Sequence, residues 1–241
     1  MESLHGLQRA GLVLIALLLV ESAAADDAHY LLPTAVDLTE LLPPPPAMGS
    51  AAAQQDLDAV LRAQAARTRS SVAAAKADAE VSVFRFADVL GPAFTRDQLP
   101  RTAALFKRAG REGNQIGGRA KEYWRRPRPP RASDRVEPLL AVLKDGSYPS
   151  GHAMYGCMTA VLLGVMVPEQ RTALLERGAT YAQNRVIAGV HYPTDVEAGC
   201  TSGKIVAAVL LQSPVFQGDF AAARDETRRA LGLPAAPSKP H

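Results

Sequence analysis

Hydrophobic residues recur three or four positions apart from residue 50 onward, and this spacing predicts α-helices. Between Ser50 and Ala79 the spacing runs through an alanine-rich stretch, which predicts one long amphipathic helix. A further helix is predicted from Asp97 to Arg108, followed by a glycine-containing break at residues 111–118 and a helical segment that carries KEYWRR. Runs of alternating β-branched residues are scarce. The pattern therefore predicts an all-α fold.

The second half of the chain has the same periodicity after a loop rich in proline and charge, residues 127–145. Ser150 is the expected N-cap of the next helix, because its hydroxyl can accept a hydrogen bond from a first-turn amide. Its apolar face comprises Ala153, Cys157, Val161, Leu162 and Val165. Pro168 is expected to open a second helix and Thr194 or Asp195 a third. We expect the first of them to be buried, within a single-domain helical bundle.

The N-terminal 25 residues have the pattern of an export signal. The apolar run LVLIALLLV is followed by small residues at Ala23, Ala24 and Ala25, and we predict cleavage after Ala25. A membrane anchor is the alternative, but a spanning helix needs about 20 apolar residues, and this run is shorter. The sequence therefore predicts export with removal of the signal and no stable membrane anchor afterwards.

Residues 26–49 contain four consecutive prolines and are predicted to form an extended arm. We expect Leu41, Leu42 and Met48 to hold this arm against the body without making it a core element. Residues 50–233 are assigned to the helical domain and residues 234–241 to a disordered tail.

The composition narrows the class of protein further. The 241-residue chain has a formal net charge of only +3, and it lacks the dense basic field with interleaved aromatic residues that binding to a nucleic acid polymer requires. It has two cysteines, Cys157 and Cys200. An oxidising destination would permit a disulfide between them, and two unpaired thiols are the alternative.

Three motifs contain the residues best suited to chemistry on an anion. In the first, Lys121 and Arg128 are two helical turns apart, so one face of a helix could present both cations to a single phosphate. A solvated basic helix end would have the same pattern. In the second, the stretch PSGH places Ser150, Gly151 and His152 at a helix start, where unpaired amides favour an anion.

The third motif is NRVIAGVHYPTD, in which Arg185, His191 and Asp195 occur together. A carboxylate on the following helix can hold one imidazole nitrogen and leave the other free to attack. His152, beside the same anion, would be suited to donate a proton. Either histidine could instead be a structural residue, a capped helix start in one case and a satisfied core histidine in the other.

The ordered set K-x6-R-P, P-S-G-H and R-x5-H-x3-D resembles that of the type 2 phosphatidic acid phosphatase (PAP2) superfamily. Asn184 stands where that family usually has serine before the second arginine. Within the superfamily, the export signal, the LLPPPPAMGS arm and the DVEAG stretch resemble the bacterial class A non-specific acid phosphatases. The matching site positions are Lys121, Arg128, Ser150, Gly151, His152, Arg185, His191 and Asp195.

The resemblance implies a helical acid phosphatase, periplasmic or secreted, that hydrolyses a broad range of small phosphate monoesters without a metal or other cofactor. It implies nucleophilic attack by His191 to form a phosphohistidine, proton donation by His152 and orientation of His191 by Asp195. The other matching residues would bind the phosphoryl group. Phosphotransfer as a side activity and a homo-oligomer are also implied. Two alternatives stay open: a vanadate-dependent haloperoxidase and a non-catalytic phosphate-binding protein.

Overall fold

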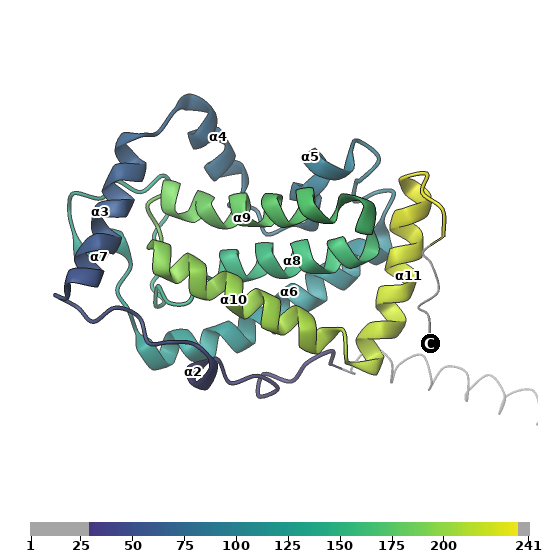
Figure 1. Cartoon of the computed structure of the whole chain (residues 1–241), viewed down its shortest axis with the longest axis horizontal. Helices are drawn as coiled ribbons and strands as arrows, with labels where there is room; N and C mark the ends of the chain where they lie inside the picture. Colours follow the sequence, from purple (N-terminus) through teal and green to yellow (C-terminus); the bar gives the residue numbers. More distant parts are fainter. Residues whose placement is uncertain (1–28, 236–241) are drawn as a thin grey trace, which may run out of the picture.

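The computed structural model describes residues 29–235, and within this range all regular structure is helical (Figure 1). The prediction of an all-α helical bundle is thus confirmed. The predicted signal and its cleavage point at Ala25 lie outside the described residues, as do residues 236–241 of the predicted tail. One extended hydrophobic cluster connects the N-terminal segment to the last helix.

Three helices form the centre of the fold: α8 (Gly151–Met166), α9 (Arg171–Ile187) and α10 (Pro193–Leu210). Helix α8 packs against both of the others and is mostly buried, as the sequence predicts, although Val165 on its predicted apolar face is 36% exposed. The Ser150 hydroxyl caps α8 by accepting a hydrogen bond from the Ala153 amide. Pro168 opens a short 3₁₀ turn, η2 (Pro168–Gln170), before α9 begins.

Small residues allow α10 to approach α8 closely. A Cβ atom at Gly199 or Gly203 would collide with the backbone of α8, so only glycine permits this packing. Cys157 of α8 and Cys200 of α10 form a disulfide across the same contact, with Cα atoms 5.1 Å apart. Of the two alternatives for the cysteines, the structure has the bridge, and the two helices therefore start side by side.

Helix α6 (Pro100–Trp124) runs beneath α8 (Figure 1). The N-terminal end of α6 contacts α11 (Pro214–Ala230). The predicted break at residues 111–118 is wrong, because α6 continues through it. Glycine in a helix interior costs about 1 kcal/mol relative to alanine, but Gly113 and Gly117 face the Met154 side chain of α8. Burial against α8 outweighs the low propensity of these glycines.

The long helix predicted between Ser50 and Ala79 is also wrong. The chain forms α3 (Ala51–Ala65) and α4 (Arg69–Ala77), which are separated at Thr68. Thr68 and Ser71 make a reciprocal capping box, which satisfies first-turn amides of α4. Arg67 donates to the carbonyl oxygens of Ile187 and Glu137 and ties the break to the body.

The segment before α3, predicted to be an arm outside the core, contributes several side chains to the core. It includes the short helix α2 (Leu38–Leu41), and Leu31, Leu38 and Leu42 are buried. Leu42 therefore faces the body as expected, whereas Leu41 and Met48 are exposed, so the prediction for these two is wrong. Leu41 is the last residue of α2, whereas Leu42 is its C-cap with extended backbone angles, so the two side chains leave the chain in different directions.

Short elements complete the fold: η1 (Val83–Phe86), α5 (Ala87–Leu90) and α7 (Pro129–Ala132). In the described range, no single helix is both long and apolar enough to span a membrane. Helices α10 and α11 together have the length and composition of a span, but they are bent by 97° relative to each other.

Candidate functional site

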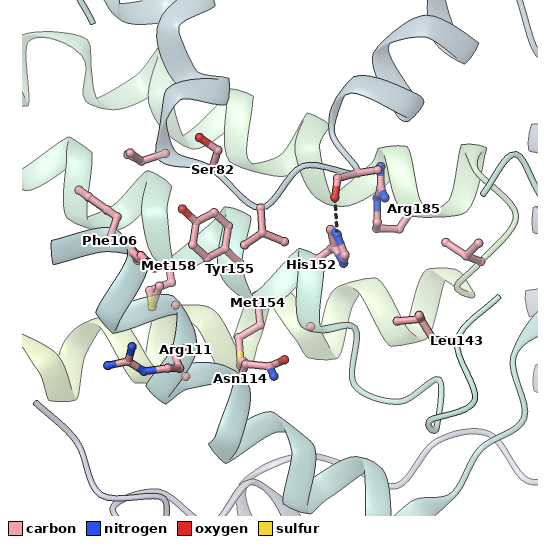
Figure 2. A pocket seen from close by; sticks show the side chains of 18 of the residues that line it. Ser82, Phe106, Arg111, Asn114, Leu143, His152, Met154, Tyr155, Met158 and Arg185 are labelled. Carbon is pink, nitrogen blue, oxygen red and sulfur yellow. Dashed lines mark hydrogen bonds between the residues drawn. The ribbon is translucent and has the colours of Figure 1, made fainter. Parts of the chain in front are cut away.

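The predicted chemical residues converge on one cavity of about 750 Å³ between α6, α8 and the loops beside them. Lys121, Arg128, His152, Arg185 and His191 all line it, although they come from separate parts of the chain. Figure 2 shows His152 and Arg185 close together in this cavity. Two imidazoles and three cations therefore face the same space.

His191 lies just before α10 and is 2% exposed. Its Nδ1 lies 3.3 Å from the Asp195 Oδ2 atom, and its Nε2 lies 3.0 Å from Nη1 of Arg128. Because the guanidinium can only donate, Nε2 must accept, which places the proton on Nδ1 toward the carboxylate. The lone pair of Nε2 therefore points at the cationic side of the cavity.

Burial lowers the pKa of His191 to about 3, even though the hydrogen bond and the charge of Asp195 act in the opposite direction. Arg128 and Lys121 lower the pKa further. The lowered pKa favours the neutral imidazole, which a nucleophilic nitrogen must be.

A buried network holds Asp195 behind His191, and the sequence motifs do not reveal it. The Oδ2 atom accepts hydrogen bonds from the Ser147 hydroxyl and the Tyr192 amide, and Oδ1 pairs with Arg126 at 2.6 Å. Arg126 also pairs with Asp56 of α3 at 2.7 Å. Burial would raise the pKa of Asp195, but the contact with His191, followed by the charge of Arg126 and the hydrogen bond from Ser147, outweighs burial and lowers the pKa. The carboxylate stays charged and fixed.

His152 is the first-turn residue of α8 and stacks on the ring of Tyr181. Its Nε2 lies 3.1 Å from the carbonyl oxygen of Ala79, which can only accept, so Nε2 carries a proton and Nδ1 is left for the cavity. Burial, and after it the positive charge of Arg185, lowers the pKa of His152 to about 4. A bound anion would act against both causes and favour the imidazolium.

Arg185 is 1% exposed, and its Nη2 donates to the carbonyl oxygen of Ala75. Its Nε has no hydrogen-bond partner among the described residues, although the atom is buried. Such a donor costs about 1–3 kcal/mol if it is left unpaired, so a ligand oxygen in the cavity would relieve it. The neighbouring Asn184 donates to Asp78 at 2.8 Å and thus supports α9 from outside the cavity.

The PSGH stretch supplies fewer amides than the sequence predicts. The Ser150 amide donates to the carbonyl oxygen of Asp195 at 2.9 Å, so it is not available to an anion, and this part of the prediction is wrong. The amides of Gly151 and His152, in the first turn of α8, have no acceptor among the described residues. These two amides remain as donors for a phosphoryl oxygen. Ser150, by contrast, is fully buried, does not line the cavity and caps α8 with its hydroxyl.

Lys121 and Arg128 do not share one helix face, which corrects another prediction. Helix α6 ends at Trp124, and Arg125 turns the chain with a φ of 48°. The two cations nevertheless meet at Asp145, whose Oδ2 lies 3.2 Å from Lys121 and whose Oδ1 lies 2.7 Å from Arg128. A bridging carboxylate brings them together instead of helical spacing.

Asp145 is the only carboxylate among the described residues that line the cavity, and its side chain is 44% exposed. Its two oxygens occupy donors that a phosphoryl group would need. Burial of Lys121 and its proximity to Arg128 lower the pKa of the ammonium, and Asp145 opposes this effect. The carboxylate therefore neutralises charge that an incoming anion would otherwise meet.

Replacement of Asp145 by asparagine is expected to strengthen binding of inorganic phosphate about three- to tenfold, because one competing negative charge is removed at the surface of the site. The measurement is the inhibition constant of phosphate at constant ionic strength. Asp134→Asn, on the same loop but exposed and outside the cavity, is the matched control. Weaker phosphate binding in Asp145→Asn would mean that Asp145 positions the two cations and does not compete.

Comparison with protein families identifies a PAP2 superfamily match over residues 113–219, the part that holds all the predicted motifs. The non-specific acid phosphatase of Salmonella typhimurium is 34% identical over 194 residues, 77% of this chain and 78% of the relative. An acid phosphatase of Zymomonas mobilis is 34% identical over 78% of this chain and 75% of that protein. The non-specific acid phosphatase of Providencia stuartii is 31% identical over 83% and 85% of the two chains.

Two solved structures share the fold at low sequence identity. A bacterial vanadium-dependent iodoperoxidase superposes with a TM-score of 0.57 at 15% identity, covering 71% of this chain and 52% of its own. A transmembrane PAP2-type phosphatidylglycerolphosphate phosphatase from Bacillus subtilis gives 0.50 at 18% identity, with coverage of 68% and 87%. At these identities the likeness concerns the arrangement of helices alone.

Proposed function

Because this chain belongs to the PAP2 superfamily and is an acid phosphatase related to the non-specific enzymes of bacteria, we propose that it hydrolyses a broad range of phosphate monoesters through a phosphohistidine on His191. The observation that carries the proposal is the position of the His191 Nε2 lone pair, which points into the end of the cavity that His152, Lys121, Arg128 and Arg185 also line. A phosphate-binding protein would need the cations but neither imidazole.

In the first step, the Nε2 atom of His191 forms a bond to phosphorus while the bond from phosphorus to the ester oxygen breaks. Nη1 of Arg128, which lies 3.0 Å from Nε2 in the free enzyme, turns to donate to the phosphoryl oxygens instead. These oxygens also accept hydrogen bonds from Lys121, Arg185 and the first-turn amides of α8. Asp195 keeps the proton on Nδ1 and stabilises the positive charge that develops on the ring.

His152 moves the proton in both steps. Its Nδ1 gives a proton to the departing ester oxygen, which leaves as an alcohol, and the neutral imidazole then takes a proton from the attacking water. Water forms the new bond to phosphorus, the bond to Nε2 breaks, and inorganic phosphate is released. An alcohol in place of water would give phosphotransfer, which we propose as a side activity.

In this proposal Lys121, Arg128, Arg185 and the first-turn amides of α8 bind only the phosphoryl oxygens, so the identity of the leaving group affects binding at the phosphoryl site little. This supports broad use of phosphate monoesters. The export pattern of the first 25 residues and the disulfide between Cys157 and Cys200 both favour an oxidising compartment. We therefore propose that the enzyme acts in the periplasm or outside the cell.

Hydrolysis of phenyl phosphate is expected to be unaffected by a metal chelator, because cationic side chains and amides bind the phosphoryl group. The rate should fall as the pH rises above about 4, since the imidazolium form of His152 is lost in that direction, and the bound anionic substrate should move this fall to higher pH. Steady-state rates with and without chelator test this directly. Complete loss of activity with the chelator would contradict the proposal, and halide oxidation only with added vanadate would favour the haloperoxidase alternative.

A further inference from the structure

The cavity extends well beyond the phosphoryl site, and we infer that its far end binds a second anionic group of an elongated phosphate monoester with an apolar or aromatic middle. The inference rests on the proposed function, because the ester phosphate must sit between His152 and His191. At about 750 Å³ the cavity greatly exceeds what one phosphate group needs, since a single water molecule in the liquid accounts for about 30 Å³.

Helix α6 provides the length scale of the cavity. Gly110, Arg111 and Asn114 line the cavity from the same helix as Lys121 at the phosphoryl site, and Lys107 lines it one turn earlier. At a rise of about 1.5 Å per residue, Arg111 lies about 15 Å and Lys107 about 21 Å from Lys121 along the helix axis. Figure 2 shows Arg185 and Arg111 on opposite sides of the cavity.

The middle of the cavity is apolar and partly aromatic. Its walls comprise Phe84, Phe106, Met154, Tyr155 and Met158. A Cβ atom at Gly110 would lie only 2.8 Å from the ring of Tyr155, so the absence of a side chain there lets this ring line the space beside α6. Aromatic and methionine side chains favour an apolar or aromatic ligand body.

The far end carries positive charge that the protein does not balance. Arg96, Lys107 and Arg111 line the cavity there and are exposed. None of the three belongs to an ion pair within residues 29–235. The guanidinium of Arg96 instead lies 5.6 Å from the ring centre of Phe84. Asp145, the single carboxylate of the described lining, is already paired with Lys121 and Arg128.

These features together describe a ligand with two anionic ends. The ester phosphate occupies the buried end, the apolar body lies against Tyr155 and Phe106, and a carboxylate, sulfonate or second phosphate reaches Arg111 and Lys107. Because these cations are exposed, the gain should be moderate and should weaken as salt screens the attraction over about 10 Å at 0.1 M.

The test compares two long alkyl phosphates of equal length, one ending in a methyl group and the other in a carboxylate that can reach Arg111. The wild-type enzyme is expected to prefer the carboxylate ester by about tenfold in kcat/KM, mainly through KM, because two exposed cations each add a modest attraction. The double variant Lys107→Gln/Arg111→Gln is expected to lose this preference. High salt should reduce it in the wild-type enzyme.

Lys204→Gln/Arg229→Gln removes the same two charge types from exposed positions on α10 and α11, outside the cavity, and should keep the preference. Phenyl phosphate, which is too short to reach Arg111, reports the catalytic centre by itself. An equal rate for the two long esters in wild type, with phenyl phosphate still hydrolysed, would overturn this inference alone. Failure to hydrolyse phenyl phosphate would overturn the proposed function and this inference with it.

Discussion

Replacement of His191 by alanine is expected to lower kcat/KM for all phosphate monoesters by about a thousandfold or more, as removal of the nucleophile does in other covalent enzymes. The covalent phosphoenzyme should disappear as well. The measurement is a quenched reaction with a ³²P-labelled monoester, in which the protein is denatured in alkali because phosphohistidine is stable there and labile in acid. Wild-type protein should retain the label.

The variant is expected to fold, because Asp195 keeps its hydrogen bonds from Arg126, Ser147 and the Tyr192 amide. Thermal unfolding checks this. His29→Ala removes a histidine that is 55% exposed and lies outside the cavity, so it should keep both activity and label. A labelled His191→Ala protein would show that another residue is the nucleophile. Partial rescue of turnover by added imidazole would support the assigned role.

Replacement of His152 by alanine is expected to slow the hydrolysis of alkyl phosphates about a hundredfold, within the usual range for loss of a general acid. The effect on p-nitrophenyl phosphate should be less than about tenfold, because its leaving group is stable without a proton. A plot of log(kcat/KM) against leaving-group pKa should therefore be steeper for the variant than for wild-type enzyme.

Tyr181→Phe is the control for disturbance of the pocket around His152. It keeps the ring that stacks on His152 but removes a hydroxyl that donates to the Glu80 carbonyl oxygen at 2.7 Å. Its slope should match that of wild type. A uniform loss across all leaving groups in His152→Ala would instead indicate that His152 binds the phosphoryl group and does not donate the proton.

Some elements of the fold could be predicted because a few neighbouring residues decide them. Ser150 caps α8, and Pro193 occupies the first turn of α10 next to the predicted Thr194. In the same way, the i, i+4 spacing of His191 and Asp195 places the carboxylate at Nδ1. Caps and short-range pairs depend on local backbone geometry, which the sequence specifies directly.

Predictions that required a balance between local preference and packing were wrong. The glycines of α6 predicted a break, but contact with Met154 keeps the helix intact. The alanine-rich stretch before residue 79 predicted one helix, but the capping box at Thr68 divides it. Helical periodicity reports the favoured local structure and not the neighbours that compete with it.

For this protein, the sequence by itself determined the helical fold and the identity of the chemical groups, because periodicity, caps and motif order are properties of short stretches of chain. The tertiary structure alone decided that Asp145 joins Lys121 to Arg128, that Arg126 and Asp56 support Asp195, and that the cavity reaches Arg111. These contacts join residues far apart in sequence, and their energies depend on burial and distance, which exist only after the helices have packed.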